Sequence, residues 1–341
     1  MTALGPIGVG VKGVSLDPAD RERLMHPLTG LIVLFASNYE SPAQLIELCG
    51  EIHALRDPPL IIAVDHEGGR VQRFRQGFTR LPPMRRLGEL WDRDVLLACR
   101  VAASLGYVMA AELRAHGVDL AFAPVLDVDH GRSSVIGDRA LHSDPRVIAM
   151  LASHLTHGLL LAGMANCGKH FPGHGWAAAD SHTALPADSR CRAEILADAA
   201  PYQWLGSTLA AVMPAHVVYS ELDDRPAGFS TRWIEQILRR ELGFTGAVFS
   251  DDLLMAGARG GGTVAQRAAT ALEAGCDFAL ICNDTAAMDE VLSAVSWRPS
   301  ADFDARLERL IPRGPAPSMV ELGDSALYRS ALADVDRIDR T

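Results

Sequence analysis

The amino-acid sequence predicts an α/β protein folded as a single (β/α)8 barrel of the TIM type. Short apolar runs rich in Val, Ile, Leu, Phe or Ala alternate with longer stretches of helical periodicity, a pattern typical of parallel strands buried on both faces. There are eight such runs, and the 341 residues of the chain suit a barrel of that many strand–helix units. Polar residues stand at the carboxyl ends of most runs, which is where such barrels carry their chemistry.

The predicted strands share two features: each is short, and each ends at polar residues or at Gly or Pro. In chain order they cover residues 7–14, 31–36, 60–65, 120–128, 163–170, 209–216, 246–252 and 278–283. Alternation of these strands with helices implies right-handed crossovers and a parallel sheet. An open, doubly wound sheet is the alternative architecture.

Four of the intervening segments carry clear helix signals. Residues 41–56 begin with a Ser-Pro start signal, and residues 94–116 stop at Gly117, a typical helix end. Residues 231–242 and 264–274 also stop at glycines. We therefore predict a catalytic barrel over residues 1–311. Residues 312–341 are Pro-rich and then polar and helical, so we expect them to pack on the outside of the barrel as an extension.

The charge balance argues against two classes of partner. The chain has 42 acidic and 32 basic residues, a net charge of −10, whereas nucleic acids and anionic membranes attract an excess of Lys and Arg. The N-terminus lacks the pattern of a secretory signal, and no uninterrupted apolar stretch approaches the roughly 18 residues of a membrane span. The six cysteines form no CxxC pair and no zinc spacing. We expect a cytoplasmic protein with reduced thiols and without nucleic-acid or membrane partners.

Residues 8–13 read GVGVKG and formally match a dinucleotide-binding fingerprint. That fingerprint requires a strand before the glycines and a helix opening within the motif, whereas these glycines lie inside the first predicted strand. We expect no nucleotide site here and no cofactor.

The segment AVDHEGGRVQRF, residues 63–74, follows the third predicted strand. Asp65 ends the strand, and Gly68-Gly69 permit a sharp turn before Arg70 and Arg73. A carboxylate in this position can accept two hydrogen bonds from a polyol. A structural Asp–Arg pair explains the same residues, so both interpretations stay open on this segment alone.

Residues 119–145 contain the fourth predicted strand and then a long polar loop, and they carry many charges, namely Asp127, Asp129, Arg132, Asp138 and Arg139. An internal ion-pair network that holds the loop accounts for most of them. We also expect one arginine of this loop to face a ligand.

Residues 167–186 read CGKHFPGHGWAAADSHTALP and are the most informative stretch. Lys169 and His170 end a strand, and the Pro and Gly residues that follow predict a mobile loop carrying His174, Asp180 and His182. In an extended segment Asp180 and His182 point to the same side, and a carboxylate beside a histidine prepares a general acid/base. A zinc site and a scatter of surface histidines are the alternatives.

The segment GAVFSDDLLMAGA, residues 246–258, is an apolar strand that ends in Ser250, Asp251 and Asp252. Successive strand residues point to opposite sides, so we expect only one of the two acids to face the barrel axis. The other can cap the next helix or bind a neighbouring backbone group. An inward carboxylate at a barrel mouth is a candidate nucleophile.

Four of these motifs together carry a resemblance. DHEGGRVQR, KHFPGHG followed by DSH, MPAH and FSDDLLM occur in this order and approximate spacing. The chain resembles glycoside hydrolase family 3, and closely the bacterial cytoplasmic β-N-acetylglucosaminidases of peptidoglycan recycling. The resemblance runs from about residue 5 to about residue 300.

The resemblance implies a single barrel without a second sandwich domain. It implies release, with retention, of terminal non-reducing β-linked N-acetylglucosamine from 1,6-anhydro-N-acetylmuramic acid, with or without a stem peptide. We expect a monomer without a metal site. At the matching positions it implies these roles: Asp251 as nucleophile, His182 as acid/base, Asp180 as the residue that orients it, and Asp65, Arg73, Arg139, Lys169 and His170 as sugar-binding residues. A β-glucosidase of the same family, a metal-dependent barrel hydrolase and a non-catalytic sugar-binding barrel are the alternatives.

Overall fold

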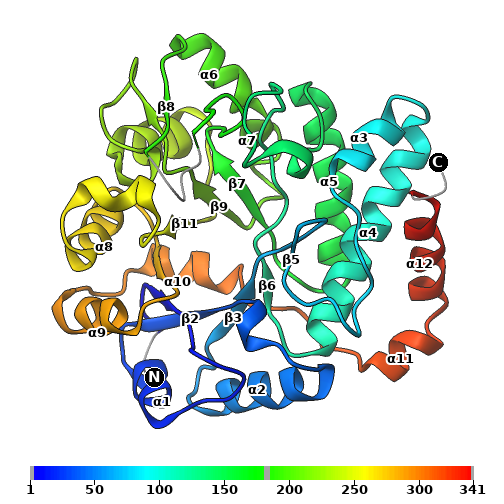
Figure 1. Ribbon diagram of the computed structural model, residues 1–341, viewed down its shortest axis with the longest axis horizontal. Coiled ribbons are helices and arrows are strands. Elements are labelled where there is room, and N and C mark those ends of the chain that lie inside the picture. Colours follow the sequence, from blue (N-terminus) through cyan, green and yellow to red (C-terminus); the bar gives the residue numbers. More distant parts are fainter. Residues whose placement is uncertain (1–3, 180–184, 339–341) are drawn as a thin grey trace.

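The computed structural model describes residues 4–179 and 185–338 of the chain. Within these residues, eight parallel strands form the central sheet in the order β6-β3-β2-β1-β12-β11-β9-β7 (Figure 1). The strands are β1 (Ile7–Val9), β2 (Thr29–Leu34), β3 (Ile61–Val64), β6 (Leu120–Ala121), β7 (Cys167–Phe171), β9 (Ala211–Pro214), β11 (Ala247–Asp252) and β12 (Phe278–Ile281). Each overlaps one of the apolar runs of the sequence.

The two outer strands, β6 and β7, meet and nearly close the sheet into a barrel. The backbone N–H of Cys167 donates to the carbonyl of Ala123 at 2.8 Å, and that of Lys169 donates to Pro124 at 3.1 Å. In return Leu126 donates to the carbonyl of Lys169 at 2.6 Å. The barrel prediction is therefore confirmed, and the open doubly wound sheet is wrong.

Helices surround the strands, as Figure 1 shows. The α-helices of the described residues are α1 (Pro18–Met25), α2 (Pro42–Ala54), α3 (Arg85–Trp91), α4 (Val95–Ala115), α5 (Pro145–Leu161), α6 (Arg192–Asp198), α7 (Ala200–Trp204), α8 (Val264–Glu273), α9 (Thr285–Ala294), α10 (Ala301–Glu308), α11 (Met319–Asp324) and α12 (Ala326–Ile338). Two small ribbons lie outside the barrel sheet: β4 (His66–Gly68) with β5 (Val71–Gln72), and β8 (Ala187–Asp188) with β10 (Val218–Tyr219).

The helix boundaries follow from capping residues that are visible in the sequence. The Ser41 hydroxyl accepts from the backbone N–H of Gln44 at 3.2 Å and begins α2. Past the ends of α4 and α8 lie Gly117 and Gly275, with φ of +85° and +112°. The predicted helix over residues 231–242 is present but has the wider π winding, over η4 (Arg232–Glu241), instead of the expected α winding.

Several strands are shorter than the apolar runs that predict them. After Val9 the chain passes close against the carboxyl end of β12, so that a Cβ on Gly10 would lie 1.9 Å from the Cys282 carbonyl oxygen. The fourth run pairs regularly only over β6, and Pro124 cannot donate a backbone hydrogen bond there. The backbone beyond these points bends to shape the mouth of the barrel.

The C-terminal residues pack along the outside of the barrel against α4 (Figure 1). The Tyr328 hydroxyl of α12 donates to Glu112 of α4, and Ser104 donates to Asp334 at 3.1 Å. Among the described helices α4 is long and apolar enough to cross a membrane by composition, but 61% of its most apolar window is buried inside the protein. The boundary at residue 311 between barrel and extension stays a prediction.

Candidate active site

A cavity of about 490 Å³ opens at the carboxyl ends of the barrel strands. Of the eight residues to which the family motif assigns a role, six lie on its wall: Asp65, Arg73, Arg139, Lys169, His170 and Asp251. They come from β7, β11 and the segments that follow β3, β5 and β6, as expected for a barrel. The two other predicted residues, Asp180 and His182, lie outside the described residues.

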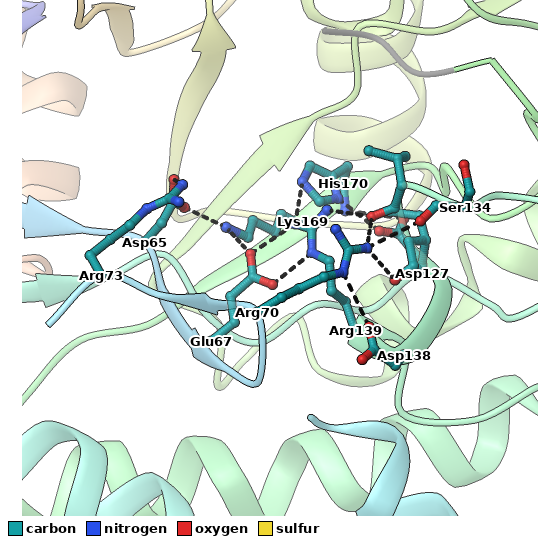
Figure 2. A network of polar contacts seen from close by, with 12 residues as sticks. Asp65, Glu67, Arg70, Arg73, Asp127, Ser134, Asp138, Arg139, Lys169 and His170 are labelled. Carbon is teal, nitrogen blue, oxygen red and sulfur yellow. Dashed lines mark hydrogen bonds and ion pairs between the residues drawn. The ribbon is translucent and has the colours of Figure 1, made fainter. Parts of the chain in front are cut away.

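A network of four charged side chains covers one side of the cavity (Figure 2). The Lys169 ammonium lies 2.7 Å from an Asp65 oxygen and 2.6 Å from a Glu67 oxygen. Arg139 donates to both oxygens of Glu67, from Nε and Nη2, each at 2.8 Å. Two carboxylates and two cations from three distant segments thus balance one another.

The mutual attraction in this network fixes its charge state. Burial acts to raise the pKa of Glu67, but Arg139 and Lys169 outweigh it and lower that pKa to about 2. In the same way burial acts to raise the pKa of Asp65, but the charges of Lys169 and Arg73 hold that pKa well below its usual range. Burial would lower the pKa of Lys169, whereas Asp65 and Glu67 raise it above its ordinary value. All four groups are charged at neutral pH.

The structure separates the two arginines that follow the Gly68-Gly69 turn. Arg73 lies 3.2 Å from Asp65, so the structural Asp–Arg pair exists, and both residues also line the cavity. Arg70 donates to the carbonyl of Val135 at 2.6 Å and pairs with Asp138 at 3.2 Å. Arg70 therefore holds the loop before α5, and Arg73 is the one paired with the cavity carboxylate.

Ion pairs hold the charged loop at residues 119–145, as expected, whereas the expectation that one of its arginines faces a ligand stays a prediction. Asp129 pairs with Arg85, and Asp138 pairs with Arg70, which ties the loop to neighbouring segments. Arg139 is the arginine of this loop that lines the cavity.

Asp127 is a residue whose role the sequence pattern did not reveal. Its side chain is fully buried, 2.7 Å from Nδ1 of His170, and it accepts the backbone N–H of His174 at 2.7 Å. Burial would raise the pKa of Asp127, but His170 lowers it to about 2. The carboxylate thus fixes the orientation of His170, whose Nε2 lies 3.5 Å from Arg139.

Glu67 was also missed. It stands between Asp65 and the glycine turn in the DHEGG motif, and its side chain is 3% exposed. An acid beside a strand end, in a segment that also carries arginines, was the available signal, but the sequence does not show which distant cations it meets.

The placement of the two acids at the end of β11 differs from the expectation that only one of them faces the barrel axis. Both Asp251 and Asp252 line the cavity, so that expectation was wrong. The pairing of β11 with β12 shifts register between Phe249 and Asp252, which interrupts the regular alternation of side chains. Asp252 also accepts the backbone N–H of Leu254 at 3.0 Å, as predicted for the second acid.

Asp251 and its neighbours form a supported strand end. The Asp251 carboxylate accepts the backbone N–H of Asp252 at 2.8 Å and keeps its access to the cavity. Behind it, the fully buried His216 stacks on Phe229, with Nε2 3.2 Å from the carbonyl oxygen of Asp252. His216, from the MPAH motif, supports the strand end. Among the described residues it is not one of those that line the cavity.

The metal alternative is not supported within residues 4–179 and 185–338, where no group of three or more His, Cys, Asp or Glu side chains is placed to hold an ion. Two of the residues on which that alternative depends, Asp180 and His182, lie outside this range. The alternative is therefore left to experiment.

Comparison with known proteins places the cavity in context. Residues 9–312 match the profile described as the glycosyl hydrolase family 3 N terminal domain. The chain is 56% identical over 330 residues to a β-hexosaminidase of Bordetella avium, covering 96% of this chain and 94% of that one. It is 53% identical over 340 residues to a β-hexosaminidase of Thiobacillus denitrificans, covering 99% and 95%.

Solved structures agree with these sequence matches. NagZ from Neisseria gonorrhoeae, in complex with N-trifluoroacetyl-D-glucosamine, superposes with a TM-score of 0.93 at 44% identity and covers 98% of both chains. The same protein in complex with a zinc ion gives a TM-score of 0.92 at 43% identity, again covering 98% of each chain.

The environment of Asp252 predicts a pH-dependent stability. Burial raises the pKa of this carboxyl from 3.8 to about 6. The raised pKa contributes stability that is fully present below about pH 4 and is lost as the pH rises through 6. We expect Asp252→Asn to remove this loss, so that between pH 4 and 7 the Tm of the wild type falls by roughly 2 to 4 °C relative to the variant.

Thermal unfolding at several pH values measures this difference, with Asp302→Asn on the exposed face of α10 as the matched control. The control should follow the wild type throughout. Parallel curves for the wild type and Asp252→Asn would show that Asp252 titrates normally in the folded protein.

Proposed function

Because this chain belongs to glycoside hydrolase family 3 and is a β-hexosaminidase, we propose that it is a retaining exo-β-N-acetylglucosaminidase that acts through Asp251 and His182. Asp180 orients His182, and the sugar is held by these five residues: Asp65, Arg73, Arg139, Lys169 and His170. The substrate class is β-linked muropeptide fragments, in which N-acetylglucosamine is joined to 1,6-anhydro-N-acetylmuramic acid.

One observation carries this proposal: Asp251 lies on the same cavity wall as the charged network of Asp65, Lys169 and Arg139. A nucleophile needs a substrate held in reach, and charged donors and acceptors bind sugar hydroxyls through strong hydrogen bonds. The cavity volume of about 490 Å³ is within the usual range for small-molecule sites.

The proposed chemistry has two steps. In the first, an Asp251 oxygen bonds to the anomeric carbon while the glycosidic bond breaks, and His182 gives its proton to the departing oxygen. In the second, His182 takes a proton from water, whose oxygen bonds to the anomeric carbon and releases Asp251. Two inversions leave the configuration retained.

A histidine suits the acid/base role on physical grounds. Most glycosidases use a second carboxyl group, whose pKa has to be raised strongly before it can act as an acid. A histidine has an ordinary pKa of about 6.5 without such a shift, so it can be an acid in one step and a base in the next. A neighbouring carboxylate, here Asp180, stabilises the protonated ring.

The finer substrate assignment, the cytoplasmic location and the monomeric state are part of the proposal. The Neisseria gonorrhoeae NagZ structure holds an N-acylated glucosamine, which supports an N-acetylglucosamine site here. Five of the six free cysteines are buried, in keeping with reduced thiols inside a cell.

The direct test compares aryl N-acetyl-β-glucosaminide with aryl β-glucoside. We expect kcat/KM to be at least about 100-fold higher for the N-acetylated substrate, since loss of a matched polar group at a shaped site is heavily penalised. A preference for the glucoside would make the protein a β-glucosidase of the same family. Activity that disappears on chelation and returns with zinc would favour a metal-dependent hydrolase, and binding without turnover would favour a sugar-binding barrel.

Covalent labelling tests the nucleophile. An N-acetylglucosaminyl fluorosugar inactivator should add its glycosyl mass to the peptide that contains Asp251, because the slowed intermediate accumulates there. Asp252→Asn should still become labelled, whereas Asp251→Asn should not. Mass found on another residue, with Asp251→Asn still fully active, would end this assignment.

Leaving-group dependence tests His182. His182→Ala should lower kcat/KM by about 100- to 10,000-fold for substrates with poor leaving groups. Aryl glycosides with good leaving groups need little protonation and should be affected much less. His157→Ala, on the exposed surface of α5, is the control and should change neither value. An equal loss for both kinds of substrate would argue against the role of His182 as acid.

A further inference from the structure

We propose that Glu67 is a positioning residue of the sugar site, which holds Lys169 and Arg139 at the separation and angle that the substrate requires. The inference rests on the proposed function and adds to it a residue that does not itself bind the sugar.

The contacts of Glu67 are those of a bridge (Figure 2). One carboxylate oxygen lies 2.6 Å from the Lys169 ammonium and also accepts from Nη2 of Arg139 at 2.8 Å. The other oxygen accepts from Nε of Arg139 at 2.8 Å. The paired hydrogen bonds to the guanidinium fix both its distance and its plane.

This bridge decides which donors remain for a ligand. Lys169 has three N–H donors; it donates one to Asp65 and pairs with Glu67 at 2.6 Å, so that at least one donor is left to the cavity. Arg139 uses Nε and Nη2 toward Glu67 and donates from Nη1 to the carbonyl of Val135 at 3.1 Å. The donors that stay available therefore have directions set by Glu67.

The bridge also neutralises a repulsion. Lys169 and Arg139 are both positive and both buried, and each disfavours the charge of the other. A carboxylate between them compensates, and attraction to these two groups lowers the pKa of Glu67 to about 2 in spite of burial. Without the negative charge the two cations would move apart and leave the geometry that a sugar needs.

Exposure separates Glu67 from Asp65, the other carboxylate of the network, whereas Lys169 is as buried as Glu67. The side chain of Asp65 is 24% exposed to the cavity, whereas that of Glu67 is 3% exposed. Both oxygens of Glu67 are engaged by cations. Glu67 thus acts through Lys169 and Arg139.

The test uses Glu67→Gln, which keeps the shape but replaces one oxygen with an amide nitrogen that faces a cation. We expect kcat/KM for an aryl N-acetylglucosaminide to fall about 100-fold, as when one partner of a buried charge pair is removed.

A matched control is available at the opposite end of the barrel. Asp277, at the amino end of β12, is a buried carboxylate that bridges Arg239 at 3.0 Å and Arg306 at 2.9 Å. Asp277→Asn should lower the Tm in a similar way but keep kcat/KM within about threefold of the wild type, because the site at the carboxyl ends is untouched.

A series of 3-, 4- and 6-deoxy aryl N-acetylglucosaminides distinguishes positioning from general damage. The wild type should lose about 10- to 100-fold in kcat/KM for at least one deoxy substrate, as expected when a hydrogen bond to a charged donor is removed. In the Glu67→Gln variant, removal of the same substrate hydroxyl should lower kcat/KM only about threefold, because the protein donor to that hydroxyl is already misplaced. In Asp277→Asn the full penalty should remain.

Glu67→Asp decides the question if the glutamine variant does not fold. It keeps the charge but withdraws the carboxylate by one methylene group, and a displacement of about 1 Å can lower the rate about 100-fold. With Glu67→Asp, the deoxy substrate that is slow with the wild type should also show a reduced penalty in kcat/KM.

The outcomes are distinct. The positioning role is overturned if the folded variant keeps kcat/KM within threefold of the wild type, if its deoxy penalties equal those of the wild type, or if the wild type shows no such penalty. The proposed function itself fails if the wild type and Asp277→Asn both leave the N-acetylglucosaminide unhydrolysed.

Discussion

The site depends on one physical interaction, the balanced contact of Asp65 and Glu67 with Lys169 and Arg139. Buried ions lose their hydration, and a buried ion pair is a weak source of stability compared with an apolar core. Its value lies in preorganisation, since charged donors and acceptors held in fixed directions need not rearrange when the ligand arrives. The network also joins the end of β3, the ribbon of β4 and β5, the loop before α5 and the end of β7, so the mouth of the barrel is tied together by the same groups that face the cavity.

The proposed mechanism divides labour between a rigid wall and a separate segment. Asp251 ends a strand in the barrel, and buried neighbours such as His216 contact the backbone beside it. The acid/base is proposed at His182, which follows β7 in the chain. A nucleophile on the strand end keeps its distance to the sugar, while an acid/base on a loop can leave room for the water of the second step.

Much of the fold was predictable because the eight strands are buried on both faces and show it as apolar runs. Placement of Asp65, Lys169 and Asp251 followed from their position at strand ends, which barrels bring together. The partners of Glu67 and Asp127 were not predictable, because Arg139 and His170 lie 72 and 43 residues away and only the folded chain decides which charges meet. Asp252 was misjudged for a local reason, since a register shift in β11 breaks the alternation on which the expectation relied. Asp180 and His182 lie beyond the described residues, and their roles rest on the family motif.

The claim that this network holds one sugar against Asp251 is tested most directly by a crystal structure of the protein with bound N-acetylglucosamine. The pyranose ring should lie in the cavity with hydroxyl groups within hydrogen-bond distance of Asp65 and Lys169. Its anomeric carbon should be about 3 to 3.5 Å from an Asp251 oxygen, the separation of a reactive complex. A sugar bound elsewhere, or one in the cavity whose anomeric carbon faces away from Asp251, would contradict the claim.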